Sequence, residues 1–140
     1  GWISRSYLIM SKQRESKQKT KETEMTIKEC YEKAGSDYEG VLKRLGSEAL
    51  VKRFAVKFLN DPSFQDLTDG LNAQDGEKAF RAAHTLKGVC LNLGFTGLYK
   101  VSAELTEVLR GRETAGSDAL YQQVKEQYTI LIEAIRELEQ

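Results

Sequence analysis

The feature that most restricts the fold of this chain is the helical spacing of its apolar residues. From residue 48 onward they recur every three or four positions over long stretches, and no stretch alternates apolar and polar residues between turn signals. Proline occurs only once, as Pro62, so little interrupts a helix. The 140 residues suffice for one domain with a single core. The sequence therefore predicts an all-α protein.

Four long amphipathic segments follow one another with short connections. The first is interrupted at Pro62, which we interpret as a kink in one long helix, with a full break as the alternative. The second segment ends at Gly94 and the third starts at Thr96, so these two helices must be antiparallel. A polar loop at residues 111–118 precedes the fourth. This order predicts an antiparallel up-down-up-down four-helix bundle.

Two short amphipathic segments precede the first long helix. One is capped by Thr26 and stopped by Gly35, and the other is capped by Ser36 or Asp37 and stopped by Gly46. Helices this short are not stable alone, so we expect them to form a lid over one end of the bundle.

Residues 1–24 differ from the rest of the chain. An apolar patch from Trp2 to Met10, interrupted by Arg5 and several serines, precedes a long polar run. The patch is too short to span a membrane and lacks the features of a signal peptide. We interpret this segment, which can form a helix, as an extension upstream of a domain at residues 25–140. A partner-binding arm is the alternative.

Charge and cysteine content exclude several classes of protein. Lys plus Arg and Asp plus Glu both total 21, which argues against nucleic-acid binding, since that needs a basic excess. Cys30 and Cys90 lack metal-ligand spacing and are interpreted as free thiols in a reducing cytoplasm. We expect a cytoplasmic monomer that binds no membrane and has no metal or cofactor of its own.

The only histidine, His84, is predicted to lie on the outer face of its helix. At about 100° per residue, the apolar residues of this segment fall within about 60° of the direction of Leu86, and His84 points about 160° away from it. The predicted inner face consists of Ala79, Ala82, Ala83, Leu86, Val89, Cys90 and Leu93. A lone exposed histidine can be without function, so its neighbours decide the interpretation.

Glu77, Gly88 and Leu91 share the outer face with His84, and Lys87 lies on its flank. Gly88 costs about 1 kcal/mol relative to alanine in a helix interior, which suggests that another molecule approaches the backbone there. Leu91 adds an apolar rim, and Lys87 can reach an anion held on the imidazole. This arrangement suits a histidine that accepts a phosphoryl group from one protein and passes it to another.

The run HTLKGxxxxLGF, preceded by FRAAH, resembles the signature of histidine-containing phosphotransfer (HPt) domains. From about Met25 to Gln140, segment order and spacing resemble the small stand-alone HPt proteins of bacteria. The resemblance implies that His84 is the phosphoacceptor through Nε2 and that Lys87 offsets the phosphoryl charge. Many members carry small or polar residues where this chain has Val89 and Leu91, which bears on partner identity. The expected docking residues are Gly88, Leu91, Phe80 and Glu77.

The expected function is that of a carrier in a two-component phosphorelay. The chain has no GxxxxGK[ST] run or other Gly-rich nucleotide loop, so it has no ATP site of its own. Its expected partners are receiver domains of response regulators and a sensor histidine kinase, with Mg2+ held by the receiver. The alternative is a helical adaptor that binds partners through the face around His84 and Leu91. A metal-binding bundle would need inward Glu-x-x-His pairs, and a single outward histidine argues against it.

Overall fold

The computed structural model describes residues 25–139, and every regular element in that range is a helix. The prediction of an all-α protein is confirmed. The interpretation of residues 1–24 as an upstream extension lies outside the described residues, as does Gln140, so the domain boundary at residue 25 stays a prediction.

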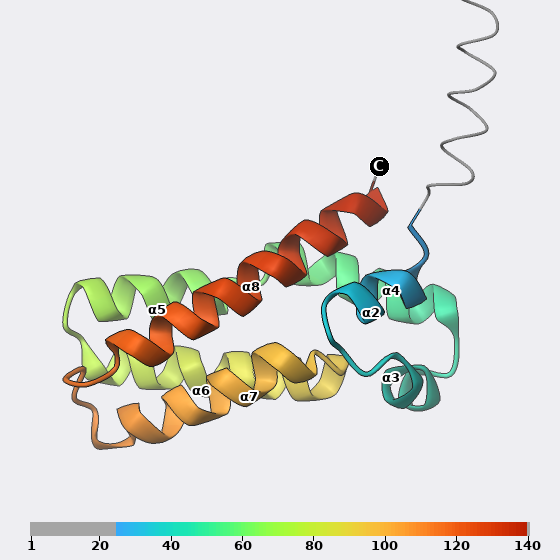
Figure 1. Ribbon diagram of the computed structural model, residues 1–140. Coiled ribbons are helices and arrows are strands. Elements are labelled where there is room, and N and C mark those ends of the chain that lie inside the picture. Colours follow the sequence, from blue (N-terminus) through green and yellow to red (C-terminus); the bar gives the residue numbers. More distant parts are fainter. Residues whose placement is uncertain (1–24, 140) are drawn as a thin grey trace, which may run out of the picture.

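Figure 1 shows a long bundle formed by α5 to α8, with α2 and α3 gathered at one end beside α4. Neighbouring helices in the sequence pack on each other, α5 on α6, α6 on α7 and α7 on α8, while α8 also contacts α4 and α2. The elements are α2 (Ile27–Lys33), α3 (Tyr38–Leu45), α4 (Glu48–Lys57), the 3-10 turn η1 (Phe58–Asn60), α5 (Ser63–Asn72), α6 (Gly76–Leu93), α7 (Thr96–Val108), the 3-10 turn η2 (Leu109–Gly111) and α8 (Asp118–Glu139).

Contacts between aromatic rings join α5 to α8 and close the bundle. The Phe64 ring stacks on that of Tyr128 at 4.0 Å and on that of Tyr121 at 6.0 Å. The Tyr121 hydroxyl also lies 2.8 Å from the hydroxyl of Thr68. Aromatic pairs add to the free energy of burial, so the first and last long arms of the bundle are held together directly.

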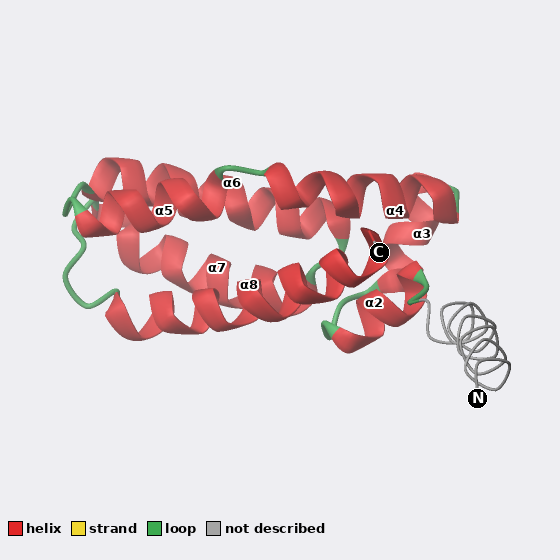
Figure 2. Ribbon diagram, turned by 90° about the horizontal axis from the view of Figure 1, so that it is seen from above, coloured by secondary structure: helices red, strands yellow, loops and turns green. Residues whose placement is uncertain are grey.

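The first long arm is broken at Pro62, so the interpretation as one kinked helix is wrong and the alternative of a full break is correct. The α4 helix tightens into η1, and Asp61 is extended, with φ −72° and ψ 126°. Pro62 has no amide hydrogen, and it disfavours helical backbone at the residue before it. The Ser63 amide donates to the Asp61 carboxylate at 2.9 Å and starts the new helix. The two segments follow one another along one side of the bundle (Figure 2).

The two short N-terminal helices begin and end where the sequence predicted. The Thr26 hydroxyl accepts from the Glu29 amide at 3.1 Å, and the Asp37 carboxylate accepts from the Gly40 amide at 3.0 Å. Asp37, and not Ser36, is therefore the cap of α3. Gly46 ends α3 in the left-handed conformation, with φ 87°.

These short helices hold the C-terminal end of α6. The acceptors are the carbonyl groups of Leu91, Asn92, Leu93 and Gly94. The Arg44 side chain donates to the first two at 3.2 and 3.1 Å, the Tyr31 hydroxyl to the third at 2.7 Å, and the Asp37 amide to the fourth at 2.7 Å. The last carbonyl groups of a helix have no partner within the helix itself. The lid therefore supplies the hydrogen-bond donors that the end of α6 lacks.

Candidate functional site

The histidine-bearing helix α6 has defined ends that fix where each of its side chains points. The Asp75 carboxylate accepts from the Lys78 amide at 3.1 Å, and Gly94 ends the helix with φ 72°. Most of the predicted inner face is buried, while Val89 and Leu93 are only partly buried, where α6 faces the end of α4. His84 is exposed, as the periodicity predicted.

Among the described α-helices, Gly88 is the glycine that packing does not explain. A Cβ atom built there would have no heavy atom within 4 Å, apart from its own helix backbone and neighbours. By contrast, a Cβ at Gly70 would lie 2.8 Å from the Ala79 amide nitrogen, and one at Gly97 would lie 2.7 Å from the Gln127 side chain. Those two positions need glycine for close packing. At Gly88 the space next to the helix is open.

Lys87 lies on the flank of α6 that faces α7. Its charge acts on Glu107 of α7, which forms an ion pair with Arg110 at 2.7 Å. The hydrogen bond from Arg110 is the largest influence on Glu107 and lowers the pKa of its carboxyl. Desolvation opposes this shift, and Lys87 adds a smaller lowering. The lysine is partly buried and lies within one turn of His84.

Leu91, which was predicted to form the apolar rim, is 56% exposed. Nearby, a groove of about 460 Å³ separates the end of α4 from α6. Its apolar wall includes Phe54, Phe58, Val89 and Leu93. Leu91 thus gives the outer face of α6 an apolar side chain on the lid side of Gly88, whereas the groove lies on the flank of α6 that faces the end of α4.

Phe80 is placed differently from the other predicted docking residues, because only 9% of its surface is exposed. Its ring lies 6.0 Å from the imidazole of His84, with 23° between the ring planes. The guanidinium of Arg112 lies 3.9 Å from the centre of the Phe80 ring, and that of Arg110 lies 5.5 Å away. The docking role of Phe80 stays a prediction, and little of its surface is open to a partner.

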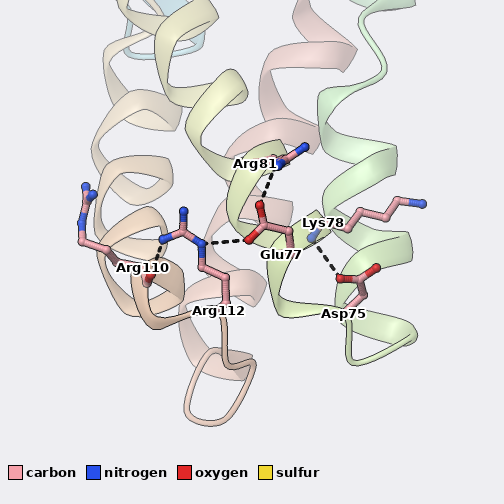
Figure 3. A network of polar contacts seen from close by, with 6 residues as sticks. All are labelled: Asp75, Glu77, Lys78, Arg81, Arg110 and Arg112. Atoms are coloured by element: carbon pink, nitrogen blue, oxygen red, sulfur yellow. Dashed lines mark hydrogen bonds and ion pairs between the residues drawn. The ribbon is translucent and has the colours of Figure 1, made fainter.

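Glu77 is exposed and already engaged by two cations. It accepts hydrogen bonds from Arg81 at 2.7 Å and from Arg112 at 2.9 Å (Figure 3). The hydrogen bond from Arg112 is the largest influence and lowers the pKa of the Glu77 carboxyl. Desolvation opposes it, and Arg81 lowers the pKa further. A docking role for Glu77 would have to include the arginines that it holds.

Arg110 and Arg112 are the two residues of this neighbourhood that the sequence analysis missed. They lie at the end of α7 and in the polar loop after it, where no periodicity marks a residue as important. Arg112 is 35 residues away from Glu77 in the sequence. The only local signal was two arginines flanking Gly111 at the end of a helix, which by itself predicts a solvated turn.

Metal-ligand clusters and membrane-spanning helices are two features that the structure can be searched for over the described residues. Within residues 25–139, no three His, Cys, Asp or Glu side chains gather in a way that could hold a metal ion. None of the helices in that range combines the length and apolar character needed to cross a membrane. Both cysteines are buried free thiols, and burial is the largest cause that raises the pKa of Cys30, to about 11. Burial raises the pKa of Cys90 as well.

The comparison with known families agrees with this geometry. A family model described as the Hpt domain matches residues 60–138, which is more than half of the chain and includes all of α5, α6 and α7. No curated protein and no solved structure matches the chain significantly. Membership of this family implies phosphotransfer in two-component signalling and interaction with receiver domains or kinases. The exposed histidine on α6 and the family match lead to one conclusion: the chain belongs to the Hpt domain family.

Proposed function

We propose that this protein is a phosphorelay carrier. His84 accepts a phosphoryl group from a kinase or from a receiver-domain aspartate and passes it to the aspartate of a response regulator. The observation that supports this best is the exposed imidazole one helical turn from Gly88, where no side chain fills the space. A partner carboxylate must come into line with the phosphorus atom on the imidazole, and this opening provides the room.

The transfer exchanges one bond to phosphorus for another. The unprotonated ring nitrogen of His84, Nε2 by resemblance to the family, attacks the phosphorus of an aspartyl phosphate. The N–P bond forms as the P–O bond to the aspartate breaks, and the carboxylate leaves with the electron pair of that bond. The reverse reaction passes the group on. Lys87 offsets the negative charge of the phosphoryl group, and Mg2+ would be held by the receiver domain.

A carrier must also keep the phosphoryl group from hydrolysis, which requires that no nearby base activates water. Glu77 is the carboxylate that shares the outer face of α6 with His84, two turns before it. Hydrogen bonds from Arg81 and Arg112 hold this carboxylate, and the lowered pKa keeps it a weak base. These contacts support a stable phosphohistidine.

Partner docking would use the outer face of α6. Leu91 gives this face an apolar rim, and Gly88 gives it clearance. Both residues lie on the same side of the helix as His84. A receiver that rests on this face would bring its aspartate over the imidazole.

The test of the proposal is phosphorylation of the full chain and of His84→Gln by a phosphorylated receiver domain with Mg2+. We expect acid-labile, base-stable phosphate on the parent protein and none on the variant, with unchanged helical circular dichroism because an exposed side chain contributes little to stability. Label on His84→Gln would contradict the assignment of the acceptor. Binding of the receiver without any transfer, across all receivers of the source organism, would favour the adaptor instead. ATP alone should give no label, because the sequence has no nucleotide loop.

A further inference from the structure

Arg112 reaches from the loop after α7 back onto α6, where it contacts Glu77 and Phe80. Its Nε atom donates to Glu77 at 2.9 Å (Figure 3). Its guanidinium lies 3.9 Å from the centre of the Phe80 ring. Glu77 lies three residues before Phe80, and His84 lies four residues after it. A cation over an aromatic ring, with its carboxylate partner alongside, has little freedom to move.

The backbone of Arg112 is also held against α6. Arg112 is left-handed, with φ 62°, and its amide donates to the Leu109 carbonyl at 2.8 Å. Its own carbonyl packs against Gly76, the first residue of α6, where a Cβ atom has no room. Within residues 25–139, Arg112 and Gln74 are the two residues other than glycine with positive φ. Such a conformation persists where the surroundings enforce it, and it often marks a functional position.

The left-handed backbone does not by itself call for an arginine at position 112. Glycine would adopt the left-handed backbone without strain, and an exposed ion pair contributes little to the free energy of folding. The arginine side chain must therefore matter for what it touches, which is the Phe80 ring and Glu77.

Phe80 carries that contact to His84. The two rings are nearly parallel, with 23° between their planes and 6.0 Å between their centres, within the range of offset stacking. An exposed side chain that lacks such a neighbour samples several rotamers. Because Phe80 is itself fixed, the imidazole has a rigid surface against which to settle.

We infer that Arg112 is a positioning residue for His84. By clamping Phe80, it narrows the orientations of the imidazole to those in which the reactive nitrogen faces the partner. Arg110 supports the same ring from 5.5 Å, while its own guanidinium is held by Glu107 at 2.9 and 2.7 Å. The role in transfer rests on the proposed function, whereas the ordering of the imidazole does not.

The test uses Arg112→Gly in the full chain, because glycine keeps the left-handed backbone and removes only the side chain. The readouts are the three-bond couplings that report χ1 of His84 by nuclear magnetic resonance, and the kcat and KM for phosphorylation by a receiver. We expect the couplings to move to rotamer-averaged values and kcat to fall about tenfold with KM unchanged, since small misplacement of reacting atoms slows transfer. Phe80→Leu should reproduce both effects, and Arg112→Lys, which keeps the cation, should restore part of each.

Arg136→Ala is the matched control, because Arg136 is an exposed arginine on α8. It should leave the couplings and kcat at parental values. Parental couplings and kcat in both Arg112→Gly and Phe80→Leu would overturn the inference. If the parent protein accepts no phosphoryl group, the proposed function fails. In that case, rotamer-averaged couplings in Arg112→Gly and Phe80→Leu would still support the ordering of the imidazole by Phe80 and Arg112. Parental couplings in both variants would overturn this ordering as well.

Discussion

The two ends of α6 are held by different parts of the chain and through different atoms. At the C-terminal end, Arg44, Tyr31 and Asp37 of the lid bind backbone carbonyl groups. At the N-terminal end, Arg112 binds the side chains of Glu77 and Phe80. Backbone contacts fix where the helix lies, whereas side-chain contacts also reach the imidazole through Phe80. The difference predicts that damage to the lid lowers stability and leaves phosphotransfer intact, while damage at the other end affects both.

The largest expected effect on stability is at the N-terminal end. In Gly76→Ala the new methyl group would meet the backbone carbonyl of Arg112, and the loop would have to move away from α6. Overpacking of this kind typically costs about 1 to 3 kcal/mol. Urea unfolding measures the loss of stability. The three-bond couplings of His84 should move to rotamer-averaged values as the loop shifts. A variant with parental stability would show that the loop is not seated on α6.

At the C-terminal end, Tyr31→Phe removes the hydroxyl that donates to the Leu93 carbonyl at 2.7 Å and leaves that carbonyl without its partner. Because this carbonyl group is only partly buried, we expect a loss of about 1 kcal/mol, the lower end of the range for an unpaired buried group. Urea unfolding should show this loss while the rate of phosphorylation stays parental. If phosphorylation is slower under conditions in which the variant is fully folded, the lid also acts on the imidazole.

Gly88 lies between the two held ends, and its variants separate stability from transfer. Gly88→Ala should stabilise the protein by up to about 1 kcal/mol, because alanine favours helix and nothing lies within 4 Å of the new Cβ. Gly88→Gln should fold at least as well but slow transfer from a receiver on the order of 100-fold, because its side chain projects into the space that the partner needs. Thermal unfolding and transfer rates test the pair. Unchanged transfer in Gly88→Gln would place the docking face elsewhere.

The smallest expected effect is on how stability depends on pH, through Glu77 at the N-terminal end of α6. Folding lowers the pKa of Glu77 below its ordinary 4.5, chiefly through the hydrogen bond from Arg112. The contribution of this group to stability is therefore present above pH 4.5 and is lost as the pH falls through the lowered value. Glu77→Gln should flatten the pH dependence of the unfolding free energy below pH 4.5, measured by urea titration. The same slope in parent and variant would show that the pair with Arg112 is not formed in solution.

Local signals in the sequence were enough to predict most of this fold. Caps such as Thr26 and Asp75, and the terminator Gly94, act within one turn, so the residues themselves indicate where the helices begin and end. The outward direction of His84 follows from helical period alone. The break at Pro62 was harder, because proline permits both a kink and a new start, and the capping of Ser63 by Asp61 decides between them.

The surroundings of His84 were less predictable. Gly88, Lys87 and Leu91 share its helix, so their spacing placed them beside it. The Arg112 contact depends on a left-handed residue in a loop that folds back onto α6, and an arginine gives no sign of positive φ. Such contacts depend on tertiary structure, which the local pattern does not contain.

The bonds from Arg44 to the Leu91 and Asn92 carbonyl groups have a consequence for how this chain can diverge. A carbonyl group is the same whatever side chain its residue carries, so substitutions at positions 91 and 92 leave these bonds in place. The side chain of Leu91, exposed on the proposed docking face, can therefore change to suit a new receiver without rebuilding the lid. Partner choice and helix anchoring therefore meet at Leu91, where mutation can alter the side chain and spare the hydrogen bond of the carbonyl group.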